Sequence, residues 1–248
     1  MKRHSTQDRP SATAPPRPRL SPRASTTPAK RRVLIVDDHP LFRDGVRMWI
    51  DQQADMTCCG EADSAASAHQ AIATQQPDLV LLDLSLGSED GFQMIKSLRT
   101  SFPHLPLLVI SENEELVFGD RVLHAGAQGY LMKREPAVEL LSAVRTVLSG
   151  EVHVSRKLAV VMLKKLWHGD PGADAITHLS DRELQVFQML GSGLGTRAIA
   201  GKLNLGIKTI ETHREHIKKK LGLKSAPGLT HAATTWMHTH SLPPTPLE

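Results

Sequence analysis

LVLLDLSLGSEDGF, residues Leu79 to Phe92, decides the fold of this chain. Four apolar residues of strand type lead into an aspartate, Asp83, and a short acidic loop with two glycines follows. An apolar run of this length, bounded by turn residues, is typical of a strand buried on both faces. Asp83 would then lie at the carboxyl end of a buried strand, either as a reactive carboxylate or as an ordinary loop residue.

The same alternation of an apolar run and an amphipathic segment occurs five times between residues 33 and 150. Five βα units predict an α/β fold, a doubly wound parallel sheet with helices on both faces. Ligands of such sheets bind beyond the carboxyl ends of the strands. The predicted strands are 33–36, 56–59, 79–82, 105–110 and 129–132, and the predicted helices are 41–52, 64–75, 91–101, 114–124 and 136–148.

Charge divides the 248 residues into three segments, which favours two domains and a tail. Residues 1–32 carry a net charge of +8, residues 33–150 of −9, and residues 151–248 of +5. The first segment, 1–31, is rich in proline and poor in large apolar residues, and we expect a disordered basic tail. An anionic polymer such as nucleic acid would be sought on the last, basic segment.

The cysteines and the hydropathy exclude two classes of protein. Cys58 and Cys59 are adjacent, so they cannot connect distant parts of the chain as a secreted disulfide scaffold would. No apolar run reaches the roughly 18 residues of a membrane span. We therefore expect a soluble, cytoplasmic protein without a membrane partner.

A second, all-helical module is predicted after a linker. The linker, 151–178, contains a helix at 156–167 and then a stretch rich in Gly, Pro and Asp. Ser180 and Glu183 stand in the capping-box arrangement that marks a helix start. Further helices are predicted at 196–203, 208–221 and 227–238, which gives a module over 179–240 and a loose tail over 241–248.

Polar residues with complementary chemistry follow the predicted strands. Asp37 and Asp38 follow the first strand, Ser111 follows the fourth and Lys133 the fifth. Carboxylates brought together repel one another unless a cation lies between them, and hard oxygen ligands favour Mg²⁺. A lysine and a hydroxyl group nearby could bind a phosphoryl group.

The motifs VDDHP, LLDLSLGSEDG and GYLMK, with Ser111 between them, resemble the receiver domain of two-component response regulators over residues 32–150. The resemblance implies a flavodoxin/CheY-like sheet and phosphorylation of Asp83 by a sensor histidine kinase. It also implies metal ligation by Asp37, Asp38, Asp83 and the backbone carbonyl of Ser85, phosphoryl binding by Lys133, and switching by Ser111 together with Tyr130, which would turn inward.

The chain departs from this pattern at three positions. Gly87 and Ser88 stand where the family commonly has proline and glycine, and Arg134 stands where many receivers have proline. His39 is assigned to a helix start, because no second metal ligand lies at a useful spacing from it. Two alternatives stay open: a receiver that acts without phosphorylation, and an aspartyl-phosphate phosphatase, although the latter needs a carboxylate where Ser85 stands.

The segments LSDREL and GTRAIAGKLNLGIKTIETHREHIKKKLGLKS resemble the LuxR-type DNA-binding domain of the NarL/FixJ subfamily, with a helix-turn-helix. The helix from Lys208 would be the recognition helix, which enters the major groove. Gly206, where the family usually has serine, would be its N-cap. The implied partners are double-stranded DNA and a second copy of the chain, with RNA polymerase as a further candidate. The candidate DNA contacts are Lys208, Thr209, Glu211, Thr212, Glu215 and Lys219.

Overall fold

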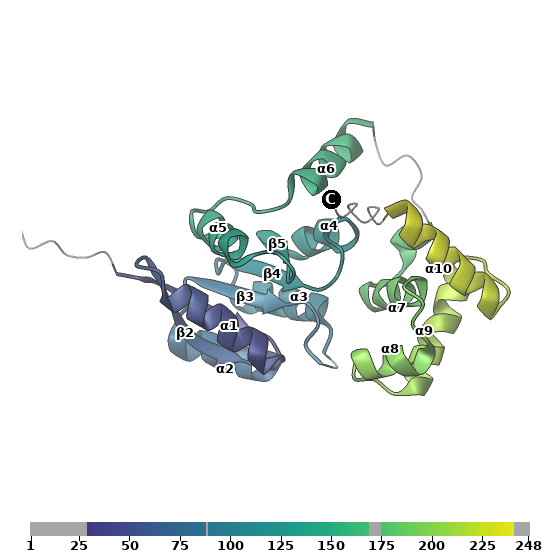
Figure 1. Cartoon of the computed structure of the whole chain (residues 1–248), viewed down its shortest axis with the longest axis horizontal. Coiled ribbons are helices and arrows are strands. Elements are labelled where there is room, and N and C mark those ends of the chain that lie inside the picture. Colours follow the sequence, from purple (N-terminus) through teal and green to yellow (C-terminus); the bar gives the residue numbers. More distant parts are fainter. Residues whose placement is uncertain (1–28, 88, 169–174, 241–248) are drawn as a thin grey trace, which may run out of the picture.

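The protein consists of a sheet-based module followed by a helical module (Figure 1). The structure, a computed structural model, describes residues 29–87, 89–168 and 175–240. The predictions for the tail at 1–28, for Ser88, for part of the linker at 169–174 and for the end at 241–248 lie outside these residues. The first strand begins at Arg31, one residue inside the predicted tail.

Five parallel strands form the sheet in the order β2-β1-β3-β4-β5, which confirms the predicted doubly wound fold. The chain moves outward in one direction from β1 to β2 and in the other from β3 onward. The carboxyl ends of β1 and β3 therefore flank the point where ligands bind in such sheets. The strands are β1 (Arg31–Val36), β2 (Met56–Ala62), β3 (Leu79–Asp83), β4 (Leu107–Ser111) and β5 (Gly129–Met132).

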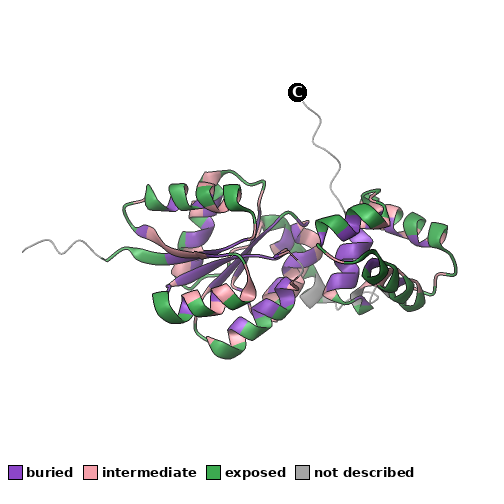
Figure 2. Cartoon of the chain, turned by 90° about the horizontal axis from the view of Figure 1, so that it is seen from below, coloured by how far each residue is buried: buried purple, intermediate pink, exposed green. Residues whose placement is uncertain are grey.

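Five helices cover the two faces of the sheet. Side chains alternate along each strand. Val33 and Ile35 of β1 therefore pack with α1 and α5, while Leu34 and Val36 pack with the other three helices. Figure 2 shows the resulting buried layer between the helices. These helices are α1 (Pro40–Asp51), α2 (Ala65–Gln75), α3 (Gly91–Ser101), α4 (Glu115–Ala125) and α5 (Ala137–Leu148).

The chain after α5 stays attached to the sheet before it reaches the helical module. The backbone N–H of His153 donates to the carbonyl of Gln128, and the carbonyl of His153 accepts from the N–H of Tyr130, both at 3.0 Å. These bonds cover part of the β5 edge. Helix α6 (Arg156–His168) then packs on α4, with Leu158 fully buried. A Cβ in place of Gly119 would meet the Cδ2 of Leu158 at 2.4 Å, so a larger residue here would displace the Leu158 side chain.

The helical module buries Phe187, Ile199, Ile210 and Ile217, and these residues belong to the same apolar cluster as those on the α2, α3 and α4 side of the sheet. The capping box predicted at Ser180 and Glu183 is present at the start of α7. Its elements are a 3₁₀ turn (Ala175–His178), α7 (Asp181–Gly191), α8 (Thr196–Lys202), α9 (Ile207–Lys220) and α10 (Ala226–His240).

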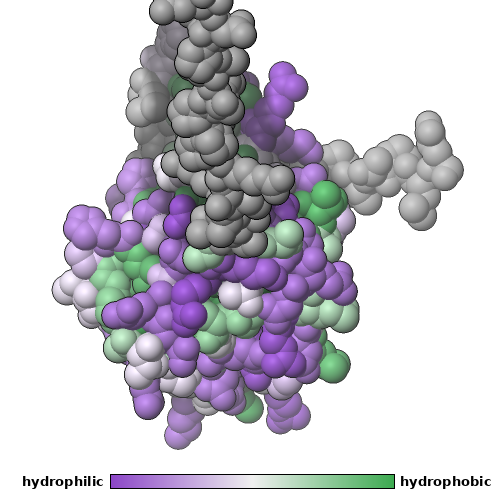
Figure 3. Space-filling model, turned by 90° about the vertical axis from the view of Figure 1, so that its left-hand side faces the viewer, coloured by the Kyte–Doolittle hydropathy of each residue, from purple (hydrophilic) through white to green (hydrophobic). Residues whose placement is uncertain are grey.

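One face of the sheet module is largely hydrophilic. Figure 3 views the end of the molecule that lies opposite the helical module, and hydrophobic residues there form small scattered areas between polar ones. Among the described helices, none is both long and apolar enough to cross a bilayer.

Candidate functional site

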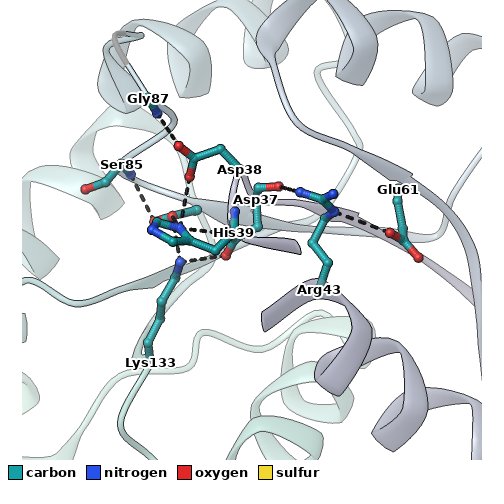
Figure 4. Close-up of polar contacts among 9 residues, drawn as sticks. Asp37, Asp38, His39, Arg43, Glu61, Ser85, Gly87 and Lys133 are labelled. Atoms are coloured by element: carbon teal, nitrogen blue, oxygen red, sulfur yellow. Dashed lines mark hydrogen bonds and ion pairs between the residues drawn. The ribbon is translucent and has the colours of Figure 1, made fainter. Parts of the chain in front are cut away.

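An acidic cluster lies where the sequence predicts it, at the carboxyl ends of β1 and β3. Asp37 and Asp83 are buried, and the Asp38 side chain is 29% exposed. One ligand atom from each of these aspartates, together with one from His39, lie within 4.8 Å of one another. Figure 4 shows the side chains of Asp38, His39 and Lys133 directed toward one another at this site. The cluster has the composition of a divalent-cation site.

Lys133 lies inside this cluster, brought there by the end of β5. Its Nζ is 2.6 Å from Asp37 Oδ2 and 2.7 Å from Asp83 Oδ2, and its side chain is only 9% exposed. Burial alone would lower the pKa of the ammonium group. The carboxylates of Asp83 and Asp37 outweigh burial, so the pKa of Lys133 is raised and the side chain stays charged.

Burial raises the pKa of the Asp83 carboxyl from 3.8 to about 6, and the neighbouring Asp37 carboxylate adds to this effect. Lys133 and the backbone N–H of Ser85, which donates to Asp83 Oδ1 at 2.9 Å, lower the pKa but do not cancel the shift. The carboxylate is thus short of solvation when it is ionised. Additional positive charge at this place would be strongly favoured.

The loop after β3 explains one departure from the family pattern. Gly87 has a φ of +51°, a left-handed conformation that glycine adopts without strain. Its N–H donates to Asp38 Oδ2 at 2.8 Å. Proline has φ fixed near −65° and no N–H, so it could provide neither feature. At this position glycine therefore supplies a bond to the acidic cluster that the common family residue could not.

Ser111 and Tyr130 lie next to one another behind the cluster. Ser111 is fully buried at the end of β4, and its Oγ accepts from the N–H of Asn113 at 3.1 Å. The Tyr130 hydroxyl donates to the Asn113 carbonyl at 2.8 Å, and burial strongly raises the pKa of this phenol. The inward position that the resemblance implies for Tyr130 is thus already present in this structure.

His39 has a different environment from the one that the sequence suggested. It is the N-cap of α1, as predicted, but its Nδ1 also lies 3.2 Å from Asp37 Oδ1 and 3.0 Å from Asp38 Oδ1. The expectation that it has no partner suitable for a metal site was wrong. Spacing to a second ligand along the chain was the wrong criterion, and the position of His39 directly after two carboxylates at a strand end was the available signal.

Arg43 is a further residue that the sequence analysis did not single out. One nitrogen of its guanidinium group donates to the Asp37 carbonyl, and Nε donates to Glu61 Oε2 at 3.3 Å. The side chain thereby ties the backbone of the acidic cluster to β2. Nothing in the local sequence indicates this contact, because Glu61 lies 18 residues away.

The six candidate DNA contacts lie on the exposed surface of α9. The buried side of the same helix is formed by Ile210 and Ile217, and Gly206 is the N-cap. Two charges near this surface are already engaged. Lys220 Nζ lies 2.7 Å from Glu183 Oε2, and Lys218 Nζ lies 2.8 Å from Glu215 Oε1. The exposed residues that are candidates for contact with DNA are Lys208, Thr209, Glu211, Thr212, Glu215 and Lys219.

Arg121 of α4 connects the two modules. Its Nη1 donates to the Leu179 carbonyl at 2.9 Å and to Asp181 Oδ1 at 3.0 Å, and its Nη2 donates to the Ile176 carbonyl at 3.2 Å. The Arg121 and Asp181 side chains are both mostly buried. The Arg121 guanidinium group thus helps to hold the segment that leads into α7 against the sheet module, beside apolar residues of the two modules that belong to one buried cluster.

Comparison with known proteins identifies both modules. Residues 33–145 match the response regulator receiver domain, and residues 177–233 match the bacterial regulatory proteins of the luxR family. Oxygen regulatory protein NreC of Staphylococcus aureus is 36% identical over 210 residues, which are 82% of this chain and 96% of NreC.

Solved structures of RcsB from Salmonella enterica serovar Typhimurium have a similar fold. RcsB bound to promoter rprA with the phosphomimetic BeF₃⁻ is 25% identical, with a TM-score of 0.55 over 83% of this chain and 99% of RcsB. The complex with promoter P1flhDC is 24% identical, with a TM-score of 0.57 over 84% and 100%. The two domain matches and the similarity to NreC over almost its whole length show that the chain belongs to the NarL-type response regulators, which are DNA-binding transcription regulators and not enzymes.

Proposed function

We propose that Asp83 accepts a phosphoryl group from the phosphohistidine of a sensor histidine kinase, and that this event controls DNA binding by the helical module. The observation that carries the proposal is the environment of Asp83. Its carboxyl group is buried and has a raised pKa, and one of its oxygens lies 2.7 Å from the Lys133 ammonium, whose side chain is itself 9% exposed. In the transfer, a carboxylate oxygen attacks phosphorus while the P–N bond breaks, and the bonding pair returns to the kinase imidazole.

The resident cation of the proposed reaction is Mg²⁺, and the residues present fit it. Asp38 Oδ1 is buried without a hydrogen bond, and the other aspartates of the cluster offer hard carboxylate oxygens. Asp38, Asp83 and the backbone carbonyl of Ser85 would hold the ion, with Asp37 assisting. Bound Mg²⁺ would neutralise the carboxylates and attract the phosphoryl oxygens.

After transfer, the groups around Asp83 would stabilise the new charge. The Lys133 ammonium now forms ion pairs with both Asp37 and Asp83. After transfer it would form an ion pair with the phosphoryl oxygens. The Ser111 Oγ now accepts a hydrogen bond from the N–H of Asn113. After transfer, the Ser111 hydroxyl would donate a hydrogen bond to the phosphoryl group. Tyr130 of β5 lies behind Ser111, and its hydroxyl donates to the carbonyl of Asn113, in the segment that leads into α4. A local change of charge would thus reach the surface that holds α6 and the helical module.

The helical module would bind double-stranded DNA through α9. Lys208, Thr209 and Lys219 would contact phosphates, which positions the helix without reading sequence. Thr212 would lie against the groove beside them. Glu211 and Glu215 could accept hydrogen bonds from cytosine, although Lys218 already competes for Glu215. Phosphorylated protein would bind two half-sites as a homodimer, and RNA polymerase is a further proposed partner.

The division of the chain that fits this function has a receiver at 32–150, a linker at 151–178 and a DNA-binding domain at 179–240. Two contacts attach the start of this linker to the receiver. His153 is bonded to the edge of β5, and Ser155 N donates to Glu115 Oε1 on α4 at 2.7 Å. The first part of the linker is therefore bonded to the receiver, at the surface that the switch residues would change.

Treatment with a small phosphodonor and Mg²⁺ tests the proposal, with intact-mass detection of the phosphoryl group. Wild type should gain one phosphoryl group and Asp83→Asn none, while Asp44→Asn, a control on the exposed side of α1, should behave as wild type. Equal phosphate signals in wild type and Asp83→Asn would remove Asp83 as the acceptor.

A regulator that works without phosphorylation is the second candidate, and the inward position of Tyr130 favours it. If that position is the active one, Asp83→Asn should bind DNA as tightly as phosphorylated wild type does. A DNA affinity that depends on the phosphodonor in wild type and is unchanged by it in Asp83→Asn would exclude this candidate.

A further inference from the structure

His39 is held in a fixed position over the acidic cluster. It is the residue before Pro40, which opens α1, and a residue before proline is restricted to extended conformations. Its φ of −92° and ψ of 104° fit this restriction. Its backbone N–H donates to Asp37 Oδ1 at 2.8 Å, so the backbone is tied to the cluster. The side chain makes no capping hydrogen bond to the helix and remains available to the cluster.

The distances around the imidazole match those of neighbouring ligands on one metal ion. Neighbouring ligand atoms of an octahedral site with bonds of about 2.1 Å lie about 3.0 Å apart. His39 Nδ1 lies 3.0 Å from Asp38 Oδ1 and 3.8 Å from Asp83 Oδ2, and it is within hydrogen-bond distance of Asp37 Oδ1, at 3.2 Å. The imidazole is 59% exposed, so it approaches from the solvent side, where water molecules would otherwise complete the coordination.

Asp38 Oδ1 supports the same interpretation. This oxygen is buried without a hydrogen bond even though His39 Nδ1 lies only 3.0 Å from it, so the two atoms are close but not aligned as donor and acceptor. Two ligand atoms that face a common point between them would have this arrangement.

We propose that His39 Nδ1 is a ligand of the metal ion at this site, which gives the site a nitrogen donor and shifts its preference from Mg²⁺ toward Mn²⁺ and Co²⁺. Imidazole binds first-row transition metals well, whereas Mg²⁺ prefers oxygen ligands and retains water. The inference rests on the metal site of the proposed function. It adds a residue that would make phosphorylation respond to the transition metal present.

Pulsed EPR of Mn²⁺ bound to the full chain tests the proposal, because a coordinated imidazole nitrogen gives a ¹⁴N modulation. The modulation should be present in wild type and absent in His39→Ala. The matched control is His124→Ala, because His124 Nδ1 also lies 3.0 Å from a carboxylate, that of Asp120, far from the cluster. His39→Asn keeps a favourable N-cap residue and should also lose the modulation.

Calorimetry of Mg²⁺ and Mn²⁺ binding gives the second measurement. Even an outer-shell residue changes metal affinity by about 10–100-fold, so His39→Ala should weaken Mn²⁺ binding at least about tenfold while leaving Mg²⁺ binding nearly unchanged. Bound Mn²⁺ without ¹⁴N modulation, or an unchanged Mn²⁺-to-Mg²⁺ ratio, overturns the role of His39 alone. Absence of saturable binding of either ion to wild type overturns the metal site itself, and with it the inference.

Discussion

Replacing Asp83 by asparagine is expected to stabilise the metal-free protein. The pKa of Asp83 rises from 3.8 to about 6 on folding, mainly because the carboxyl group is buried. Each pKa unit corresponds to about 1.36 kcal/mol, so the ionised carboxylate costs about 3 kcal/mol of stability at neutral pH. Asparagine can keep the bond from the Ser85 N–H, and Lys133 retains Asp37 as a partner.

The stabilisation by Asp83→Asn should depend on pH in a defined direction. Below pH 3.8 the carboxyl group is protonated in both states, and the charge term disappears. Between pH 3.8 and about 6 the unfolded state releases its proton first, so the advantage of the variant grows with pH. Above about pH 6 both states are ionised, and the advantage reaches its full value.

Urea denaturation in EDTA at pH 7.5, compared with pH 4.5, measures this effect. With an m-value of roughly 2 kcal/mol/M, the midpoint of Asp83→Asn should exceed that of wild type by roughly 1–2 M at pH 7.5. Mg²⁺ should narrow the gap, because it binds and stabilises only the wild type well. Asp44→Asn, at a carboxylate that is 61% exposed, is the control and should change little. An equal or lower midpoint for Asp83→Asn at pH 7.5 would refute the argument from burial.

Three further predictions concern the loop, the contact between modules and the DNA surface. Gly87→Ala should lower the free energy of unfolding by about 1–2 kcal/mol, because a residue with a Cβ is strained at φ +51°. Gly87→Pro should lower it further. A denaturation midpoint that is unchanged in either variant would contradict this loop geometry. Arg121→Ala should weaken the attachment of the helical module to α4 and so speed trypsin cleavage between residues 156 and 178. An unchanged cleavage rate would show that this side chain does not contribute to the attachment. Lys219→Ala should lower the salt slope of DNA binding by about 1 while stability stays unchanged. Lys220→Ala should instead destabilise the helical module, because Lys220 forms an ion pair with Glu183. A loss of stability in Lys219→Ala together with a smaller salt slope in Lys220→Ala would contradict these assignments.

The sequence was sufficient for the features that depend on local pattern. Each apolar run became a strand in the expected order, and the Ser180–Glu183 box starts α7 as predicted. Strand β2 extends to Ala62, beyond the predicted Cys59, because the polar GEA segment pairs with β1 across a register shift near Val33 and Leu34. A polar edge segment carries no hydropathy signal, so its pairing could not be predicted.

The acidic cluster was predictable because strand ends of a parallel sheet meet at one edge. The side-chain interactions around the acidic cluster were harder to predict. Arg43 and Glu61, His39 and the carboxylates, and Arg121 and Asp181 all depend on the direction of long or exposed side chains. The conformation of Gly87 was also not visible in advance, since glycine permits a left-handed φ without requiring it.

The most direct test of the central claim is the DNA affinity of the full chain with and without phosphodonor, measured by fluorescence anisotropy on a fragment obtained by in vitro selection. Random DNA of the same length serves as competitor, at a stated salt concentration. Phosphodonor and Mg²⁺ should strengthen specific binding by wild type at least about tenfold, a coupling free energy of about 1.4 kcal/mol, and should leave Asp83→Asn unchanged. An affinity of wild type that does not respond to phosphodonor, although Asp83 is shown to be phosphorylated, would contradict this claim.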